Sequence, residues 1–264
     1  MPNPSPARMH DFEVVSNEEI AEGIFSLVIL APRLASALKP GQFVNIRVPG
    51  DASELLRIPL SYVSADAEHG TVEIWYAVVG NATRRMSQWK PGFTSDLLGP
   101  GGRGWKAPEG TKRVLVVGGG IGVPPVLCLA RELVSAGVAV DACVGAASAS
   151  KLVGLEDFRA LGCDQVCVAT DDGSAGACGF CTDPASELLA AGGYDYVATC
   201  GPGVMMSKVA AAAAEAGVYC EASLERMMSC GFGACSTCNV ETTDGMQGAC
   251  MCGPVFDASK VVVW

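Results

Sequence analysis

Five of the 13 cysteines lie together near the C-terminal end, in the stretch "SCGFGACSTCNVETTDGMQGACMC" (229–252). Cys230, Cys235 and Cys238 are spaced C-x4-C-x2-C, and Cys250 and Cys252 follow. Four thiolates suit zinc or an iron–sulfur cluster. Zinc sites usually take two close pairs, whereas this run of three is the plant-type [2Fe–2S] spacing. The spacing favours an iron–sulfur cluster, with zinc and inert packing thiols as alternatives and either Cys250 or Cys252 as fourth ligand.

A second chemical feature is the glycine-rich loop in "VLVVGGGIGVPP" (114–125), at the point where a strand should turn into a helix. Glycines let the backbone approach a diphosphate, and a helix N-terminus offers free N–H groups. The pattern is not G-x-G-x-x-G, and the acidic residue expected about 20 positions later is met loosely by Asp141. A tight turn without a ligand is the alternative. The tripeptide Cys200-Gly201-Pro202 ends a later strand of the same sheet.

The first hundred residues have the pattern of short strands. Strand-like runs lie in 12–32, 41–50, 58–66 and 71–80, and 82–90 is a candidate short helix. The segment "LLGPGGRGWKAPEG" (97–110) is dense in Gly and Pro, which predicts a linker. Five or six strands at this spacing suggest a small antiparallel barrel.

After residue 110 the pattern alternates between apolar strands and helices. Strands are expected in 112–120, 138–146, 165–173 and 194–203, and helices in 123–137, 152–162, 183–193 and 204–217. Asp183 is a plausible N-cap with Pro184 at the first helical position. This alternation predicts a parallel sheet with helices on its faces.

The bulk composition excludes some functions. The formal net charge is −10, and the pair Arg84–Arg85 is the only basic patch in the sequence, which argues against nucleic acid. The N-terminal stretch lacks an apolar segment, so we expect neither a signal peptide nor membrane insertion. With no export signal, the other cysteines are expected to be packing residues of a cytoplasmic protein. Two histidines give little support to a hydrolytic or His-zinc site.

The order of these features resembles the ferredoxin–NADP reductase superfamily. The sequences "SLERMMSCGFGACSTC" and "CMCGPVFDASKV" are similar to the electron-transfer subunits of NAD-linked dihydroorotate dehydrogenases, and the resemblance covers essentially the whole chain. It implies an N-terminal antiparallel Greek-key β-barrel that binds FAD (1–108), a parallel-sheet NAD-binding α/β domain (109–218) and a small [2Fe–2S] domain (219–264).

The resemblance also implies site residues. The last family cysteine stands three positions before the Gly of "GPVF", which selects Cys250 beside Cys230, Cys235 and Cys238 and leaves Cys252 as a spare. The family's Arg-Pro-x-Ser flavin segment appears as "RIPLS", with Ile58 at the arginine position and Arg57 one residue away. Arg84 and Arg85 are candidate substitutes. The implied flavin and nucleotide residues are Arg57, Ile58, Pro59, Leu60, Ser61, Trp75, Tyr76, Ala77, Gly80, Ala82, Thr83, Gly119, Gly120, Gly122, Pro125, Cys200, Gly201 and Pro202.

The function implied by the resemblance is electron transfer between NAD(H), FAD and [2Fe–2S], with no catalytic base. The implied partner is an FMN-containing catalytic subunit that oxidises dihydroorotate in pyrimidine biosynthesis, two copies of each. An exposed patch at Met227, Met228 and Phe232 would suit docking. The lack of arginine after the second strand, where Ala147 stands, favours NAD over NADP. Alternatives are the flavin subunits of bifurcating transhydrogenases or hydrogenases and, in another class, a zinc-stabilised binding module without redox chemistry.

Overall fold

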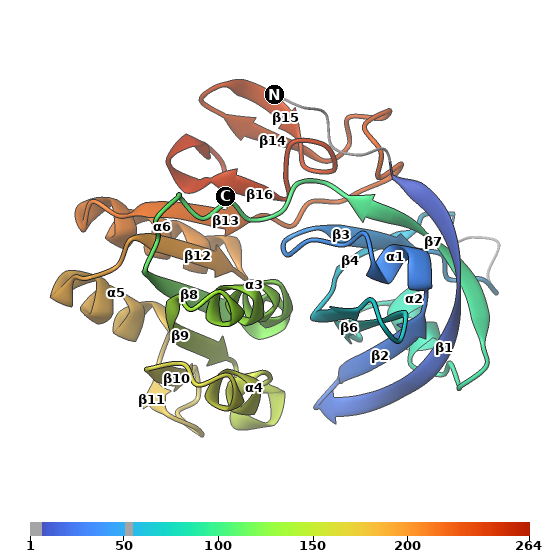
Figure 1. The fold of residues 1–264 in the computed structure, drawn as a ribbon, viewed down its shortest axis with the longest axis horizontal. Helices are drawn as coiled ribbons and strands as arrows, with labels where there is room; N and C mark the ends of the chain where they lie inside the picture. Colours follow the sequence, from blue (N-terminus) through green and yellow to red (C-terminus); the bar gives the residue numbers. More distant parts are fainter. Residues whose placement is uncertain (1–6, 51–54) are drawn as a thin grey trace. The chain divides into compact units, whose positions relative to one another are not determined.

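The computed structural model describes residues 7–50 and 55–264. The first sheet is an antiparallel sheet of seven strands in the order β4-β3-β7-β1-β2-β6-β5 (Figure 1). It curls so that edge strand β4 packs against β6, which makes an open half-barrel rather than a closed barrel. Its strands are β1 (Arg8–Ala21), β2 (Ile24–Leu30), β3 (Phe43–Ile46), β4 (Ile58–Ser61), β5 (Ser64–Asp66), β6 (Thr71–Ala77) and β7 (Thr94–Gly101).

The strand β7 corrects the expectation of a linker over 97–110. Residues up to Gly101 belong to the sheet, because β7 pairs with both β1 and β3. Its glycines serve packing rather than a turn. A Cβ at Gly101 would lie 2.6 Å from the ring of Phe43, and one at Gly99 would lie 3.1 Å from Val44. Two short helices complete this part, α1 (Pro32–Ala35) and α2 (Asn81–Met86), and α2 confirms the helix expected over 82–90.

The second sheet has the order β11-β10-β9-β8-β12-β13-β16 and is parallel except for the β13–β16 pair. It confirms the expected parallel α/β arrangement. Its strands are β8 (Arg113–Gly119), β9 (Ala139–Ala146), β10 (Val166–Thr170), β11 (Ala177–Cys178), β12 (Tyr196–Cys200), β13 (Tyr219–Ser223) and β16 (Val255–Asp257). Strands β8 and β9 are buried along nearly their whole length, as the absence of alternation in their sequences predicts.

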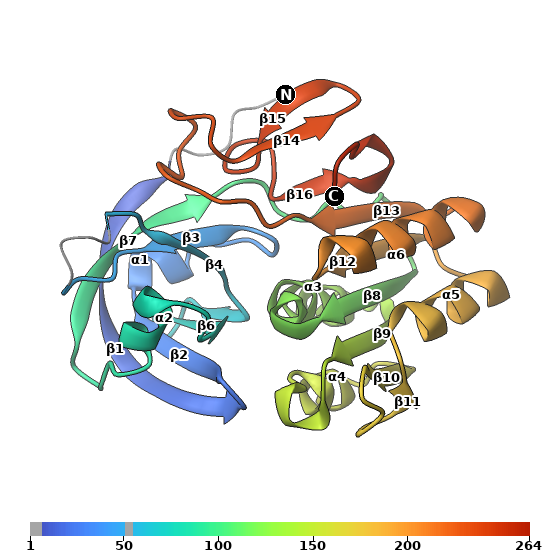
Figure 2. The same ribbon diagram turned by 180° about the vertical axis from the view of Figure 1, so that it is seen from behind.

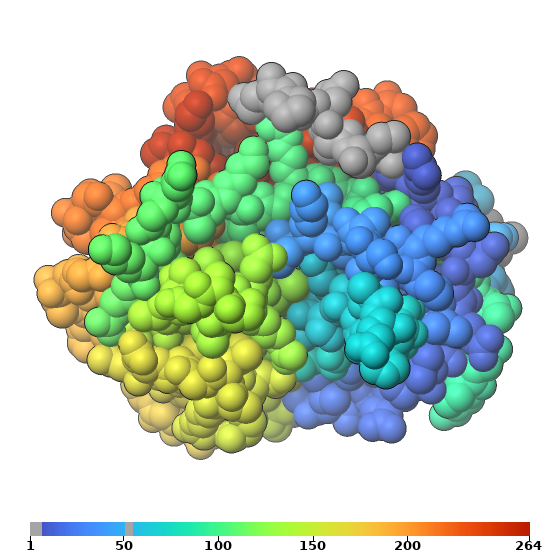
Figure 3. All heavy atoms as spheres, viewed as in Figure 1, coloured from blue at the N-terminus to red at the C-terminus, as the bar shows by residue number. Residues whose placement is uncertain are grey.

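Four helices cover the two faces of this sheet. Helices α3 (Val123–Ser135) and α4 (Leu155–Ala160) lie on one face, and α5 (Thr182–Ala191) and α6 (Gly203–Glu215) lie on the other (Figures 1 and 2). The space-filling view in Figure 3 shows the green to yellow-green atoms of α3 and α4 closing over their face. Short 3₁₀ turns are η1 (Gly120–Gly122), η2 (Ala149–Lys151) and η3 (Ala258–Lys260).

The start of α5 differs from the expected one. The N-cap is Cys181, and Pro184 occupies the third helical position, so the prediction of Asp183 as N-cap is wrong. Proline is tolerated there because the first N–H groups of a helix have no partner within the helix. Asp183 instead places its charge in the first turn, where the helix dipole favours an anion.

The C-terminal part contains a two-stranded sheet of β14 (Asn239–Thr242) and β15 (Gly245–Gly248) before β16. The chain forms two compact units. The first contains the half-barrel up to Gly104 together with 225–240 and 246–254, and the second contains 105–224, 241–245 and 255–264. The cysteine run therefore belongs to the same unit as the half-barrel. The three domain boundaries taken from the family remain a prediction. Among the helices of the described residues, none has the length and hydrophobicity needed to cross a membrane.

Candidate cofactor sites

The nucleotide loop lies where the strand order of the second sheet reverses. The chain runs outward from β8 to β9 and β10, then returns to β12 on the other side of β8. Ligands of open α/β sheets bind at the carboxyl ends of strands at such a switch point. Gly119–Gly122 follow β8, and Cys200–Pro202 end β12. The structure thus brings both predicted segments to the same edge.

The two segments pack directly on one another, and only glycine fits between them. A Cβ at Gly122 would collide with the carbonyl oxygen of Cys200. A Cβ at Gly119 would lie 2.6 Å from the sulfur of Met205 and 3.2 Å from Pro202. Met205 is a residue that sequence reasoning missed, since a Met at a helix start has no motif. The loop leads into α3, whose first residues include Pro124 and Pro125.

Asp141 is not a ribose ligand. It lies in the first half of β9, away from the carboxyl end of the strand, and is fully buried. Its carboxylate accepts hydrogen bonds from Arg113 (2.7 Å) and from the hydroxyl of Tyr194 (2.6 Å), while Gln165 donates its backbone N–H. Asp141, which meets the expected acidic position only loosely in the sequence, does not supply it in the structure, and its carboxylate ties β8, β9 and the loop before β10 together.

The carboxyl end of β9 is bordered by acidic residues. The backbone N–H of Asp172 donates to the carbonyl oxygen of Ala147 (3.3 Å). The Asp172 carboxylate accepts the Ser174 hydroxyl (2.5 Å), and hydrogen bonds from Ser174 lower the pKa of Asp172. This edge therefore carries negative charge next to the position where an arginine would bind a 2′-phosphate.

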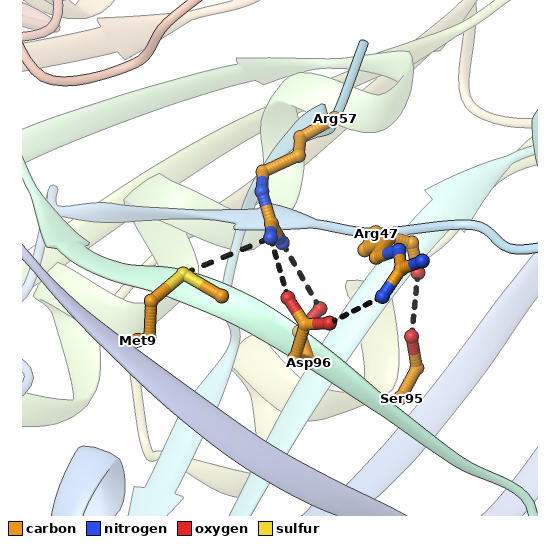
Figure 4. A network of polar contacts seen from close by, with 5 residues as sticks. All are labelled: Met9, Arg47, Arg57, Ser95 and Asp96. Carbon is orange, nitrogen blue, oxygen red and sulfur yellow. Dashed lines mark hydrogen bonds and ion pairs between the residues drawn. The ribbon is translucent and has the colours of Figure 1, made fainter. Parts of the chain in front are cut away.

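In the predicted flavin segment, the side chain of Arg57 is bonded to a residue of another strand. Arg57 precedes β4, and its guanidinium bonds to Asp96 of β7, at 2.5 Å to Oδ1 and 3.2 Å to the backbone oxygen (Figure 4). Arg47 reaches the other carboxylate oxygen at 3.2 Å. Burial works against ionisation of Asp96, but the hydrogen bonds from Arg57 and Arg47 prevail and lower its pKa. Residues Ile58, Pro59, Leu60 and Ser61 are half-buried on β4.

In the second predicted flavin segment, residues 75–83, the polar side chains form hydrogen bonds within the half-barrel. The Tyr76 hydroxyl donates to Asn17 (3.1 Å), and burial raises the pKa of Tyr76 to about 12. The Trp75 indole donates to Glu73 (2.8 Å). The Thr83 hydroxyl accepts the backbone N–H groups of Val79 and Gly80 and closes the first turn of α2. These residues shape the segment around Ala77, Gly80 and Ala82.

The four predicted cluster cysteines lie near one another. Cys235 interacts with Cys230, and Cys250 interacts with both Cys238 and Cys230. Backbone N–H groups already donate to two of the sulfurs, from Ala234 to Cys230 (3.3 Å) and from Cys250 to Cys238 (3.4 Å). Within residues 7–50 and 55–264, no group of three or more His, Cys, Asp or Glu side chains is arranged so that it could hold a metal ion.

The protonation of these thiols follows their surroundings. Hydrogen bonds from the hydroxyl and backbone N–H of Thr237 lower the pKa of the exposed Cys235 to about 6. Burial, together with the neighbouring Cys238, raises the pKa of Cys250 to about 12. A bound cation removes this penalty, since a coordinating thiol loses its proton.

The loop between the cysteines is shaped to leave room. Gly231 and Gly233 have φ angles of +75° and +88°, a region that favours glycine. A Cβ at Gly233 would lie 2.6 Å from Met251, and one at Gly231 would collide with the Asn45 side-chain nitrogen. The glycine cradle and the all-sulfur donor set fit an iron–sulfur cluster.

The surface near the first ligands is partly apolar. Met227 is 76% exposed and Phe232 is 55% exposed, but Met228 is buried at 6%. The expected patch therefore consists of Met227 and Phe232, and Met228 is a core residue. Helical spacing could not separate these two methionines, because they fall in irregular backbone.

Comparisons with known proteins agree along the chain. Residues 225–262 match the family model for the iron–sulfur cluster binding domain of dihydroorotate dehydrogenase B. The electron transfer subunit of dihydroorotate dehydrogenase B (NAD(+)) from Bacillus caldolyticus is 39% identical over 257 residues, covering 95% of this chain and 97% of the relative. The corresponding subunit from Shouchella clausii is 36% identical, with 95% and 96% covered.

Solved structures give the same fold. A structure reported in a study of flavin-based electron bifurcation by the NADH-dependent reduced ferredoxin-NADP oxidoreductase is 32% identical, with a TM-score of 0.86 over 95% of this chain and 89% of that one. An Amycolatopsis cytochrome P450 reductase, at 22% identity and a TM-score of 0.68, shares the fold alone. With relatives this similar over nearly their full length, the chain belongs to the family of electron transfer subunits of NAD-linked dihydroorotate dehydrogenase.

Proposed function

We propose that this chain carries electrons between NAD(H) and a partner flavoprotein through bound FAD and a [2Fe–2S] cluster. The observation that carries the proposal is the all-sulfur set Cys230, Cys235, Cys238 and Cys250 around a glycine-shaped loop, in a chain related to electron transfer subunits over nearly its full length. Four cysteines with the C-x4-C-x2-C spacing support a [2Fe–2S] cluster. Zinc also takes four cysteine ligands, and the metal analysis below separates the two.

The residues of the chain position the cofactors rather than react. When bound, the flavin exchanges a two-electron hydride with the nicotinamide and passes single electrons to the cluster. The glycines of 119–122 let a diphosphate approach the backbone at the start of α3, where free N–H groups favour an anion. Cys200, Gly201 and Pro202 line the adjacent strand end. Cys230, Cys235, Cys238 and Cys250 would hold the irons.

The choice of NAD over NADP rests on the charge beside β9. Ala147 is at the position where family members often carry arginine, and Asp172 is hydrogen-bonded to it. A 2′-phosphate there would meet a carboxylate without a paired arginine. Steady-state reduction of a dye with NADH and with NADPH tests this choice, and a higher kcat and lower KM with NADPH would refute it.

The partner we propose is a catalytic subunit with FMN that oxidises dihydroorotate to orotate in the cytoplasm, assembled as two of each chain. Electrons then run from dihydroorotate through FMN, [2Fe–2S] and FAD to NAD. The exposed Met227 and Phe232, close in sequence to Cys230, supply an apolar docking surface. The test is co-expression with a dihydroorotate-oxidising flavoprotein.

The pair is expected to co-elute as a heteromer and to reduce NAD with dihydroorotate. The lone chain should reduce dyes with NADH but leave dihydroorotate unoxidised. Separate elution of the two proteins, or dihydroorotate oxidation by the lone chain, would overturn this assignment.

A second candidate is the flavin subunit of an electron-bifurcating complex, favoured by the 32% identity to the structure from that study. The relatives named for dihydroorotate dehydrogenase reach 39%. The same co-expression, repeated with a bifurcating catalytic subunit in place of the dihydroorotate-oxidising one, separates the two assignments by which partner co-elutes.

The cluster itself is tested by its metal content. The anaerobically purified chain should hold about two irons and two acid-labile sulfides. Cys250→Ser should lose the cluster, because Cys250 pairs with Cys238. Cys252→Ser is the matched control, two residues away, and should keep the metal. The reverse pattern would make Cys252 the fourth ligand, and stoichiometric zinc would overturn the redox function.

A further inference from the structure

One buried amide lies beside the cysteine run without a partner. Asn45, on β3, is only 2% exposed, and its Nδ2 has no hydrogen-bond partner among the described residues. Its neighbours Val44 and Ile46 are fully buried apolar side chains. A buried amide donor without an acceptor is costly, so such groups usually indicate a ligand or ion that accepts the bond.

The donor points at the cluster loop. A Cβ on Gly231 would collide with Asn45 Nδ2, its nearest atom, whereas the distances to Cγ and Oδ1 would be 2.9 and 3.5 Å. The nitrogen is therefore the part of the amide nearest the loop. Gly231 directly follows Cys230, and both belong to the same compact unit as β3. The contact thus lies inside one folded unit.

The sulfurs in this loop already accept N–H groups. Ala234 donates to Cys230 and Cys250 donates to Cys238 from the backbone. Hydrogen bonds to cluster sulfurs stabilise the more negative reduced state and so raise the reduction potential, more strongly where water is excluded. From β3, Asn45 brings a side-chain amide next to this loop, at Gly231.

We propose that Asn45 Nδ2 donates a hydrogen bond to a sulfur on the Cys230 side of the [2Fe–2S] cluster and thereby raises the reduction potential of that cluster. This inference rests on the proposed function, since it requires the cluster. Asn45 is a positioning residue: it ligates no metal and sets how readily the cluster accepts an electron.

The strand that carries Asn45 also carries the flavin segment. In the β3–β4 pair, Asn45 lies opposite Pro59, within the "RIPLS" segment that the family resemblance assigns to flavin. Opposite residues of an antiparallel pair share a face of the sheet. Asn45 therefore contacts the cluster loop and also pairs with the predicted flavin strand. At this position a change in the reduction potential of the cluster acts directly on electron transfer between the cluster and the flavin.

The experiment is a redox titration of the full chain, followed by the EPR signal of the reduced cluster. Asn45→Leu keeps the approximate shape and removes the donor, and Asn45→Asp keeps the shape while replacing the donor by a carboxylate. We expect each variant to lower the equilibrium constant for reduction about tenfold, which is about 59 mV for one electron. Val44→Ala is the matched control: it loosens the same strand without touching the loop and should shift the constant less than about twofold.

A second readout separates a hydrogen bond from mere packing. Pulsed EPR of the reduced chain should show a weak nitrogen coupling in addition to those of the backbone donors Ala234 and Cys250, and this additional coupling should be lost in Asn45→Leu and kept in Val44→Ala. Unchanged potentials in both Asn45 variants with full iron content, or an equal shift in Val44→Ala, would overturn the role of Asn45. Absence of iron and sulfide from the wild-type chain would instead overturn the proposed function.

Discussion

The nucleotide loop and the flavin segment were predicted in the same way, from short motifs, and differ in what the structure does with them. In the nucleotide loop Gly118, Gly119 and Gly122 have a packing reason, such as Gly122 against the Cys200 carbonyl, and Gly120 has a positive φ. In the flavin segment the nearest arginine, Arg57, is bonded to Asp96 of another strand. One site depends on backbone shape and the other on a side-chain charge.

The difference indicates which kind of site tolerates sequence change. A loop that binds through backbone N–H groups needs glycine wherever another strand comes close, so its motif is narrow. A cationic contact to a diphosphate can come from several positions, so the family arginine can be replaced by Ile58 without loss of the fold. We expect a single added methyl group to weaken nucleotide binding at the first site, and an added positive charge to strengthen flavin binding at the second.

The largest effect is expected at Gly122. In Gly122→Ala the new Cβ would collide with the Cys200 carbonyl oxygen, which is backbone and cannot rotate away. We expect a loss of about 3 kcal/mol in the free energy of unfolding and at least about a tenfold weaker binding of NADH. Urea denaturation and fluorescence titration with NADH measure the two quantities.

The control for that variant is in the same loop. Gly120 has a φ of +54°, but a Cβ there would meet nothing within 4 Å. Gly120→Ala therefore carries backbone strain without a collision and should cost about 1 kcal/mol. Equal losses in the two variants would show that strain, not the contact between β8 and β12, limits the loop.

Much of the second sheet could be predicted from sequence, because buried parallel strands and glycine-ended helices leave direct patterns. The linker prediction over 97–110 failed since Gly99 and Gly101 of β7 pack closely against Val44 and Phe43, which only the neighbouring strand reveals. The partner of Arg57 lies 39 positions away, and no local pattern encodes it. Asn45 was overlooked for the same reason: a polar residue in an apolar strand becomes meaningful only with Gly231 beside it.

A medium effect is expected when the family charge is restored at Ile58. Ile58→Arg places a cation at the position that holds the flavin diphosphate in the family, whereas Arg57 stays on Asp96. An added charge-assisted hydrogen bond should tighten FAD binding about tenfold, or about 1.4 kcal/mol. Equilibrium dialysis of the deflavinated chain measures it. Leu30→Arg, at the exposed last residue of β2, adds the same charge elsewhere in the half-barrel and should leave FAD affinity within about twofold; an equal gain there would mean that net charge alone acts.

The last comparison concerns the two cations on Asp96, which differ in burial. Arg57 has a side chain 23% exposed and Arg47 one that is 61% exposed. Arg57→Ala should cost about 1.5 kcal/mol of unfolding free energy at pH 7, because it removes a partly buried charged hydrogen bond, and Arg47→Ala less than about 0.5 kcal/mol. The FAD content of Arg57→Ala should not change. A loss of FAD there would return Arg57 to the flavin site.

The same pair predicts a pH dependence with a defined sign. The pKa of Asp96 is lower in the folded chain than its ordinary value, so its stabilisation is present above the unfolded pKa of about 3.9 and is lost as pH falls through the folded pKa. The stability difference between the wild-type chain and Arg57→Ala should therefore be constant from pH 7 to about pH 5 and shrink towards pH 3. Urea denaturation at each pH measures it. A difference that persists at pH 3 would mean that Arg57 stabilises the half-barrel through its packing on β7 and not through the charge of Asp96.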